Sequence, residues 1–384
     1  MNDSSLAKPR LSFSLQELSG SLGDLGLFIP LVVAVAHLSD MNLGTILIAA
    51  GLMNIATGYL FRQPIPVQPM KAIAAVAIAD GMTSGSIMAA GMGMAVLLLA
   101  LSLSGGLDLI HRYVPEALVR GIQLGVGLIL VAKGVRWILD LPGLGLNSIA
   151  TAVVVSGLLF VFLAKKIPGL LFVFIGGFLF VYIGQPGLFS DLEFVLPPVI
   201  LAWPTPSEWR LGLLQGALPQ LPLTLLNSVI AVCALSSDYF PRRGIAPRKM
   251  AISVAMMNFV CVPFGAIPMC HGAGGLAAQY GFGARTGGSV VMLGMMKLLM
   301  GLVIGGFLLQ VLSSYPDAIL APMLILAGVE LAKSCFSLES KTDRSIALIT
   351  ALGIVGGNTI IGFILGSGAA LISAAWKRST RRIR

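Results

Sequence analysis

The stretch PIPVQPMKAIAAVAIAD, Pro64–Asp80, places three prolines within six residues directly before a short apolar segment. Proline removes a backbone donor and restricts the residue before it, so these first six residues cannot continue an ordinary helix. Residues 70–80 suffice for a helix of roughly 16 Å, about half the hydrocarbon thickness of a membrane. Lys71 then lies in the first turn, where the helix dipole is already positive. A negative partner, either a bound anion or a buried acid, is therefore expected beside Lys71.

The composition of the chain is that of a membrane protein. Of its 384 residues, 57% are hydrophobic and only 11% are charged, whereas soluble domains carry about 25% charged residues. Long uncharged apolar runs recur, which predicts an all-α polytopic membrane protein. The four cysteines form no CxxC pair, so neither a disulfide framework nor a metal site is expected. We also expect no cofactor, and no nucleophile–base pair suggests an enzyme.

The apolar segments fall into two sets of seven. The predicted spans are 20–38, 43–61, 70–80, 86–105, 115–138, 148–164 and 168–184, then 211–235, 247–262, 272–282, 288–312, 316–333, 344–356 and 358–376. The expected domains are a cytoplasmic N-terminus (1–19), membrane repeat 1 (20–184), an extracytoplasmic loop (185–210), membrane repeat 2 (211–376) and a basic cytoplasmic tail (377–384).

The basic residues predict the orientation. With both termini in the cytoplasm, most Lys and Arg residues fall inside, as the positive-inside rule requires. Lys133 and Arg136 are exceptions, because they lie near the outer end of the fifth segment. The net charge of +9 therefore reflects topology and contact with membrane lipid rather than nucleic acid. We expect a multi-pass protein of the cell (plasma or inner) membrane.

Sequence matches relate the two sets. SLGDLGLFIPLVVAVAHL from Ser21 aligns with ALPQLPLTLLNSVIAVCA from Ala217, LMN at 52–54 with MMN at 256–258, and IPVQPMKAIAA from Ile65 with IPMCHGAGGLA from Ile267. These matches keep offsets between 196 and 204 residues. Because seven segments is an odd number, the second repeat must be inverted in the membrane. Inverted repeats with interrupted helices are typical of secondary transporters, which bind substrate near the midplane.

The inversion brings two short helices together. Residues 70–80 and 272–282 should approach from opposite faces, so that two positive dipole ends and their free N–H groups suit an anion. His271 can donate hydrogen bonds or carry a proton, and Gly272, Gly274 and Gly275 let N–H groups approach a ligand. A core role for His271 and close packing of the glycines are the alternatives.

Two acids and two amides complete the predicted site. Asp24 and Glu330 lie within apolar segments, so each is a candidate proton carrier or an ion-pair partner of Lys71. Gln220 and Asn227 are neutral donors that could contact an oxyanion. The Met-rich run 290–300 is assigned to ordinary helix packing, and Lys297 within it either reaches to the interface or is paired.

Three stretches resemble a known family. ELSGSLGDLGLFIPL, PIPVQPMKAIAA and FGAIPMCHGAGGLAAQYGFGARTG closely resemble signature stretches of the molybdate transporter family, a distant branch of the sulfate permeases (SulP), and the resemblance covers essentially the whole chain. It implies the uracil-permease-like fold of two inverted seven-segment repeats, with segments 3 and 10 as half-helices. It also implies molybdate as substrate, with sulfate or tungstate as relatives. The substrate site carries over onto Gln68, Pro69, Met70, Lys71, Ala72, Cys270, His271, Gly272, Ala273, Gly274 and Gly275. No regulatory domain of the sulfate-permease kind is expected after the last segment.

The sequence therefore predicts a secondary active transporter that imports a tetrahedral divalent oxyanion, molybdate first, by alternating access. Moving two negative charges inward against 100 mV costs about 4.6 kcal/mol, at roughly 2.3 kcal/mol per charge. Coupling to protons through Asp24 or Glu330 is the expected source of that energy. A sulfate transporter or anion exchanger of the same fold is the alternative, and an anion channel is a further one. A homodimer is left open.

Overall fold

The computed structural model describes residues 10–107, 115–164, 169–190, 194, 196–197, 201, 203–241, 243–306, 311 and 314–383. Residues 1–9 of the predicted N-terminal arm, part of the predicted 185–210 loop and Arg384 of the basic tail lie outside the described residues.

The helices follow the predicted segments closely. Those of the first repeat are α1 (Leu15–Leu38), α2 (Leu43–Phe61), α3 (Lys71–Asp80), α4 (Ser84–Ser104), α6 (Glu116–Leu139), α7 (Ile149–Ala164) and α8 (Gly169–Gly184). Those of the second are α9 (Pro206–Leu211), α10 (Leu218–Leu223), α11 (Ala231–Tyr239), α12 (Pro247–Cys261), α13 (Ala273–Gly281), α14 (Gly288–Gly306), α16 (Asp317–Ala332), α17 (Lys341–Gly356) and α18 (Thr359–Ile383). Short 3₁₀ turns occupy Pro186–Phe189 (η1), Val262–Phe264 (η4) and Lys333–Ser337 (η5).

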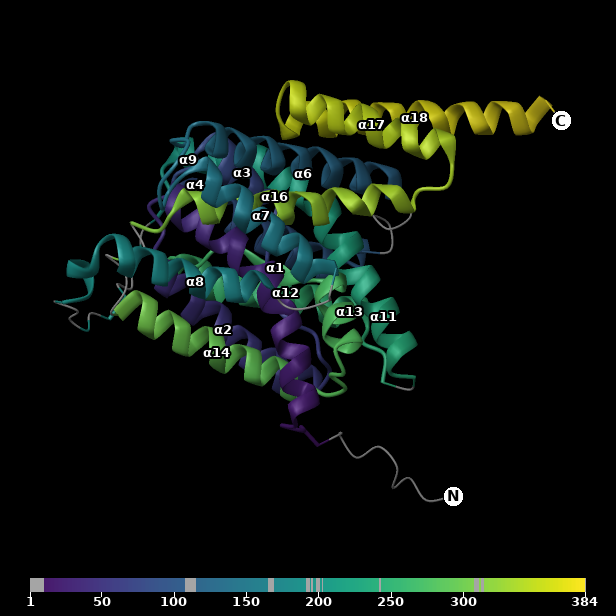
Figure 1. The fold of residues 1–384 in the computed structure, drawn as a ribbon. Helices are drawn as coiled ribbons and strands as arrows, with labels where there is room; N and C mark the ends of the chain where they lie inside the picture. The colour runs from purple at the N-terminus through teal and green to yellow at the C-terminus, as the bar shows by residue number, and fades with distance from the viewer. Residues whose placement is uncertain are drawn as a thin grey trace, which may run out of the picture.

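Three predicted segments are longer than expected. α1 begins at Leu15 instead of residue 20, and α18 continues to Ile383 instead of residue 376. The eighth segment is extended most. α9, α10 and α11 form a continuous helical run of 34 residues, Pro206–Tyr239, instead of 211–235. It begins early because Thr205 and Glu208 form a capping box, which satisfies two backbone donors reciprocally. The run includes two π-helical turns, η2 (Gly212–Ala217) and η3 (Thr224–Ile230), and such turns frequently mark functional sites. Figure 1 shows α9 at the left and α11 at the right, the two ends of this run.

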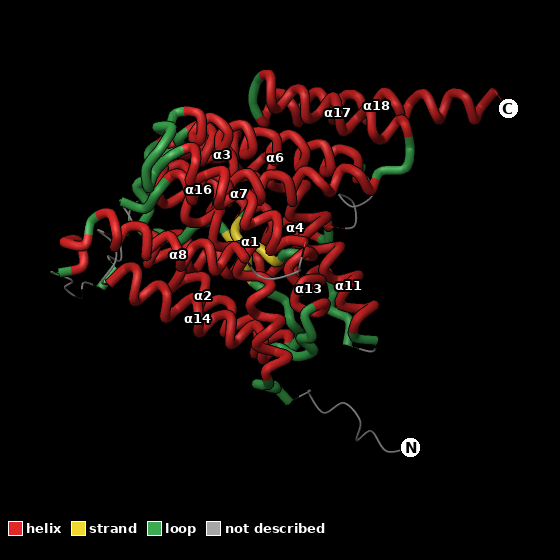
Figure 2. Tube along the Cα trace, viewed as in Figure 1, coloured by secondary structure: helices red, strands yellow, loops and turns green. Residues whose placement is uncertain are grey.

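Two short strands lie at the centre of the helices (Figure 2). β1 (Val67–Pro69) pairs antiparallel with β2 (Met269–His271), with Gln68 opposite Cys270. α3 begins two residues after β1, and α13 begins two residues after β2. The predicted half-helices, each preceded by an extended proline-containing segment, are therefore confirmed.

The helix contacts repeat with the two sets exchanged. α2 packs on α14 as α12 packs on α4, and α1 packs on α13 as α10 packs on α3. Likewise α17 contacts α6 as α7 contacts α16, while α6 and α16 contact each other. Each repeat thus completes the other, as an inverted pair requires.

An asparagine anchors each strand. Asn54 Oδ1 accepts the Val67 N–H at 2.9 Å, and Asn258 Oδ1 accepts the Met269 N–H at 2.8 Å. These asparagines end the matched LMN and MMN triplets, and each holds the first residue of its strand. The weakly matching triplets therefore mark the same structural feature in both repeats, an asparagine that binds the first residue of the strand.

The described helices include six that are long and apolar enough to cross a membrane: Leu43–Phe61, Ser84–Ser104, Glu116–Leu139, Pro206–Tyr239, Gly288–Gly305 and Asp317–Ser337. Shorter apolar helices accompany them. Many large apolar side chains on the outer helices are exposed, for example Phe160 and Leu352 at 72% and 70%, which suits a lipid-facing surface.

Candidate anion site

A cavity of about 530 Å³ lies between the two half-helices and the α6–α16 pair. Lys71, the first residue of α3, and Ala273 and Gly274, the first two of α13, all line it. It continues past Asn227 and α11 to Arg120, near the start of α6, and Glu330, near the end of α16. Both half-helix N-termini thus border one water-accessible volume.

The start of α3 is capped from the second repeat. Gln220 Oε1 accepts the Ala72 N–H at 2.8 Å and the Ile73 N–H at 3.4 Å, and its Nε2 donates to Thr224 Oγ1 at 2.8 Å. Gln220 was expected as a donor to an oxyanion. In the structure its carbonyl oxygen instead accepts hydrogen bonds from backbone groups that an anion would otherwise use. The π-helical turns on either side of α10 place it there.

The start of α13 has the opposite character. Within the described residues, no acceptor binds the N–H groups of Ala273, Gly274 and Gly275. The Gln68 side chain from β1 lies against this turn, since a Cβ on Gly272 would overlap Gln68 Oε1 and one on Gly275 would lie 2.6 Å from its Nε2. Gly274 instead has open space around it and is exposed to the cavity.

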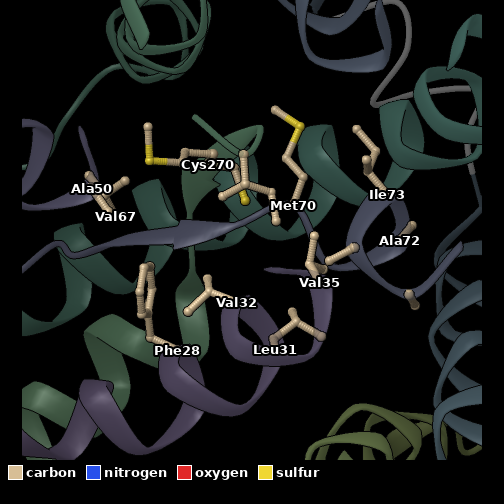
Figure 3. Packing of buried hydrophobic residues seen from close by; sticks show 14 of the residues in the cluster. Phe28, Leu31, Val32, Val35, Ala50, Val67, Met70, Ala72, Ile73 and Cys270 are labelled. Carbon is tan, nitrogen blue, oxygen red and sulfur yellow. The ribbon is translucent and has the colours of Figure 1, made fainter. Parts of the chain in front are cut away.

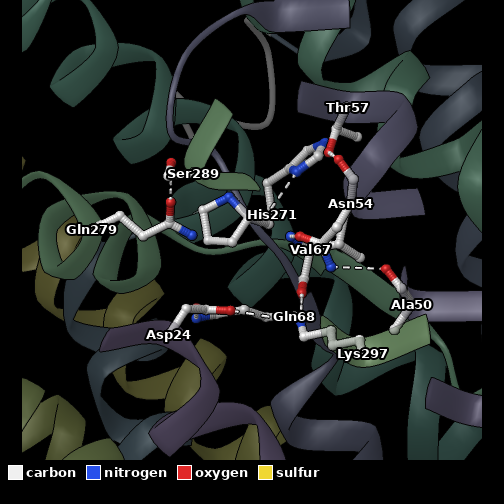
Figure 4. A network of polar contacts seen from close by, with 11 residues as sticks. Asp24, Ala50, Asn54, Thr57, Val67, Gln68, His271, Gln279, Ser289 and Lys297 are labelled. Carbon is white, nitrogen blue, oxygen red and sulfur yellow. Dashed lines mark hydrogen bonds and ion pairs between the residues drawn. The ribbon is translucent and has the colours of Figure 1, made fainter. Parts of the chain in front are cut away.

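Asp24 and Lys297 form a fully buried ion pair behind Gln68 (Figure 4). Asp24 Oδ2 lies 3.6 Å from Lys297 Nζ, and Asp24 Oδ1 accepts a hydrogen bond from Gln68 Nε2. Lys297 also donates to the Val67 carbonyl at 3.0 Å and stands 3.6 Å above the Phe28 ring. Of the two expected roles of Lys297, pairing is the one that the structure shows. A buried pair of this kind is costly to break from one side.

Lys71 has neither of the acid partners considered for it. Glu330 Oε1 binds Lys333 Nζ at 2.6 Å, and Asp24 binds Lys297. Among the residues that the structure describes, no carboxylate lies within 4.0 Å of the Lys71 ammonium. Its charge therefore borders the cavity without a direct ion-pair partner, beside two helix N-termini, although buried Asp24 lies within electrostatic reach.

Other predicted residues are buried behind this surface. Met70 and Cys270 pack in the apolar core (Figure 3), and Pro69 belongs to β1. His271 is fully buried, with Nδ1 3.2 Å from the Pro66 carbonyl and Nε2 3.1 Å from Ser253 Oγ. These residues shape the two half-helix starts without lining the cavity.

Sequence reasoning missed the opposite wall of the cavity. Arg120 donates to Glu116 Oε1 at 2.9 Å and to Gln123 Oε1 at 3.3 Å, and Ser334 Oγ donates to Gln123 Oε1 at 2.5 Å. This polar cluster joins α6 to η5, the turn directly after α16. PEAL at 115–118 and PDAI at 316–319, a further matching pair at an offset of 201, mark the starts of α6 and α16, so the repeat itself was the available signal.

Comparison with known proteins decides the family. The profile described as "Molybdate transporter of MFS superfamily" matches residues 16–130 and 212–331. Molybdate transporter 1 of Arabidopsis thaliana is 37% identical over 96% of this chain and 90% of its own. Molybdate transporter 2 of that plant is 39% identical over 92% and 86%. This chain belongs to the molybdate transporter family.

Solved structures identify the fold of this family member. The transmembrane domain of the cyanobacterial bicarbonate transporter BicA matches with a TM-score of 0.65 at 15% identity, covering 92% of this chain and 97% of that one. Murine Slc26a9, solved as an anion transporter in the inward-facing state, matches with a TM-score of 0.69 at 15% identity, covering 97% and 70%. The fold is therefore the inverted seven-segment repeat of the SulP/SLC26 transporters, which agrees with the half-helices and not with the 3+3 repeats of major-facilitator proteins.

Proposed function

We propose that this protein is a secondary active transporter that imports molybdate across a cell membrane by alternating access. One observation carries the proposal: the Lys71 ammonium, which has no direct ion-pair partner in the described residues, and the uncapped start of α13 border the same 530 Å³ cavity. A divalent oxyanion needs positive charge and several N–H donors, and this cavity wall supplies both. The molybdate transporters among the relatives support the choice of substrate.

The proposed binding step uses the two half-helices differently. Lys71 neutralises part of the anion's charge, and the amides of Ala273 and Gly274 donate to its oxygens. Asn227 and the Arg120–Gln123 cluster form the polar side of the entry route. The backbone at the two half-helix starts is held in place by residues that need not touch the anion: Gln68, Ala72, Cys270, His271, Gly272 and Gly275.

The cavity extends toward α11, and we assign this end of the molecule to the cytoplasm. Arg243, Lys249, Arg285, Lys333 and Lys341 belong to the loops and helix ends on that side, as the positive-inside rule expects. The structure is then inward-open, and both termini are cytoplasmic. The same proposal includes the five-part domain division, with an extracytoplasmic loop before α9. It also includes location in the cell (plasma or inner) membrane.

Proton coupling is proposed through Asp24, with Glu330 as the second candidate. Asp24 is buried and touches Gln68, which lies on the first turn of α13. A change in the charge of Asp24 therefore alters the electrostatic potential at the start of α13, the half-helix that would hold the anion. Glu330 lines the cavity, but its carboxylate is paired with Lys333 and partly exposed, so it is a weaker sensor.

Uptake by the purified protein in proteoliposomes tests the function. Labelled molybdate should accumulate when the outside is acidic, and excess tungstate or sulfate should compete according to their affinities. Asp24→Asn should abolish pH-driven accumulation while molybdate still binds, and Glu330→Gln should do so only if Glu330 is the carrier. Stronger competition by sulfate than by unlabelled molybdate would make this a sulfate transporter. Equilibration without accumulation under any gradient would indicate a channel.

A further inference from the structure

A second cavity lies at the other end of α3, and the transport scheme above does not use it. Its volume is about 270 Å³, and its walls come from the end of α3, the last turns of α6 and the junction between α17 and α18. Lys133, Arg136, Asp80, Asn358 and Thr359 are its polar lining residues. At ~30 Å³ per water molecule, the volume holds a small ion with part of its hydration shell.

The two cavities share the same two helices. Lys71 lines the first cavity and Asp80 the second, so one half-helix of about 14 Å separates them, at 1.5 Å per residue. On α6, Arg120 and Leu130 line the first cavity, whereas Lys133 and Arg136 line the second. α3 packs on α6, and Ala72 and Ala74 of α3 and Ile122 and Val126 of α6 are fully or almost fully buried. The two cavities therefore lie at opposite ends of α3, and α6 borders both.

Charge in this second cavity favours an anion. Lys133 and Arg136 are three residues apart and so share a face of α6. Within the described residues, neither makes an ion pair, and Asp80 is the one acid among the residues lining this cavity, within electrostatic reach of Lys133 but beyond 4.0 Å. The lining residues thus carry a net charge of +1. Asn358 adds polarity: its Oδ1 accepts the Ile361 N–H at 2.9 Å, which leaves its NH₂ group as a donor.

We propose that this second cavity is a capture site for a small oxyanion on the face of the membrane opposite the first cavity. Lys133 and Arg136 attract the anion and hold it at the end of α3 before the transporter opens to that side. This also explains why two basic residues occupy the outer end of a helix, where the positive-inside rule disfavours them. The inference rests on the proposed function only for the identity of the anion.

Charged thiol reagents test the site without any transport measurement. A reporter cysteine, Ala132→Cys, is placed on the cavity wall in a Cys335→Ser background, since the other three native cysteines are buried. The rate ratio of an anionic to a cationic methanethiosulfonate reagent then reports the local potential in nanodiscs. Neutralising both Lys133→Gln and Arg136→Gln should lower this ratio about tenfold at 10 mM salt. The effect should nearly vanish at 1 M salt, where the Debye length shrinks from about 30 Å to about 3 Å.

Arg210→Gln is the matched control, because it removes a positive charge near the same end without lining the cavity. It should leave the ratio unchanged within about twofold. Molybdate or sulfate should slow modification of the reporter, and this protection should disappear in the double Gln variant. An unchanged ratio in the double variant, an equal drop in the Arg210→Gln control, or protection that survives the double substitution would each overturn the capture site. If the wild type accumulates no molybdate, the proposed function fails while this result still stands or falls by itself.

Discussion

The two half-helix starts differ although the fold relates them by inversion. At α3, the fixed charge of Lys71 faces the cavity and the Gln220 carbonyl oxygen already satisfies the amides of Ala72 and Ile73. At α13, no charged side chain faces the cavity within the described residues, and the first amides have no acceptor. One start therefore contributes charge and the other contributes hydrogen-bond donors.

The buried residues behind the two half-helix starts also differ. Asp24 and Gln220 occupy matching positions of the repeats, at an offset of 196, and each lies beside the half-helix of the other repeat. Gln220 is neutral and finds its partners locally. Asp24 is charged, and its charge is balanced from a different helix by Lys297. The α13 side is thus held by a buried ion pair, and the α3 side by a neutral cap.

The largest expected effect is a loss of stability when the ion pair behind α13 is broken. Lys297→Ala should lower the free energy of unfolding by about 3–5 kcal/mol, because it leaves the Asp24 carboxylate buried without a counter-charge. Thermal melts of the detergent-solubilised protein measure this. The double variant Asp24→Asn/Lys297→Met should recover most of the lost stability, and Lys341→Ala, at the exposed start of α17, serves as the surface control. A Lys297→Ala protein that melts like the wild type would show that the pair is not buried in solution.

The next effect concerns the α3 side. Lys71→Ala should weaken molybdate binding roughly ten- to a hundred-fold, since a charge-assisted hydrogen bond contributes about 1.5–3 kcal/mol. Because Lys71 has no ion-pair partner in the described residues, the melting temperature should stay close to that of the wild type. Calorimetric titration with molybdate, run beside melts, separates the two quantities. Unchanged affinity in a folded Lys71→Ala protein would remove this lysine from the site.

The sequence predicted the architecture because backbone signals are local. The prolines before residue 70 and around residue 268 interrupt helices wherever they occur, and the Asn-ending triplets at 54 and 258 mark matched positions. The half-helices, their strands and the repeat could all be found this way. Segment ends were predicted less well: the 206–239 run begins early because a capping box at Thr205 ends the loop, and α1 and α18 also extend past their predicted bounds.

The partners of charged residues could not be predicted in the same way. Asp24 and Lys297 are 273 residues apart, and no pattern in one sequence gives the distance between α1 and α14. Asp24 and Lys71 were both expected beside an opposite charge, but the wrong pairing was considered. The partners of Gln220 could not be read from the sequence either, because its Oε1 accepts from Ala72 and Ile73, 148 and 147 residues away in the chain.

A smaller effect sharpens the role of the neutral cap. Gln220→Ala should cost about 1 kcal/mol of stability, as loss of a helix cap typically does, and should leave molybdate affinity within a few-fold. Gln220→Glu should keep the cap but place a carboxylate beside Lys71, so affinity should fall while the melting temperature is retained. Melts and titrations of the two variants give the comparison. Equal affinity in both variants would mean that a carboxylate at position 220 does not act on the bound anion, which would place the anion away from the start of α3 and from Lys71.

The smallest expected effect distinguishes the glycines of α13. Gly274→Ala adds a methyl group into open space, so stability and molybdate affinity should each change by no more than about 0.5 kcal/mol, as for an ordinary surface substitution. In Gly275→Ala, by contrast, the new Cβ would lie 2.6 Å from Gln68 Nε2 and 2.8 Å from Asp24 Oδ1. It must displace Gln68 or break the contact to Asp24, so this variant should melt clearly lower. Melts of the two proteins in parallel, followed by titration of the stable one, make the test. Similar destabilisation by both substitutions would place Gly274 against protein rather than the cavity, and the donors of α13 would then be closed to an anion.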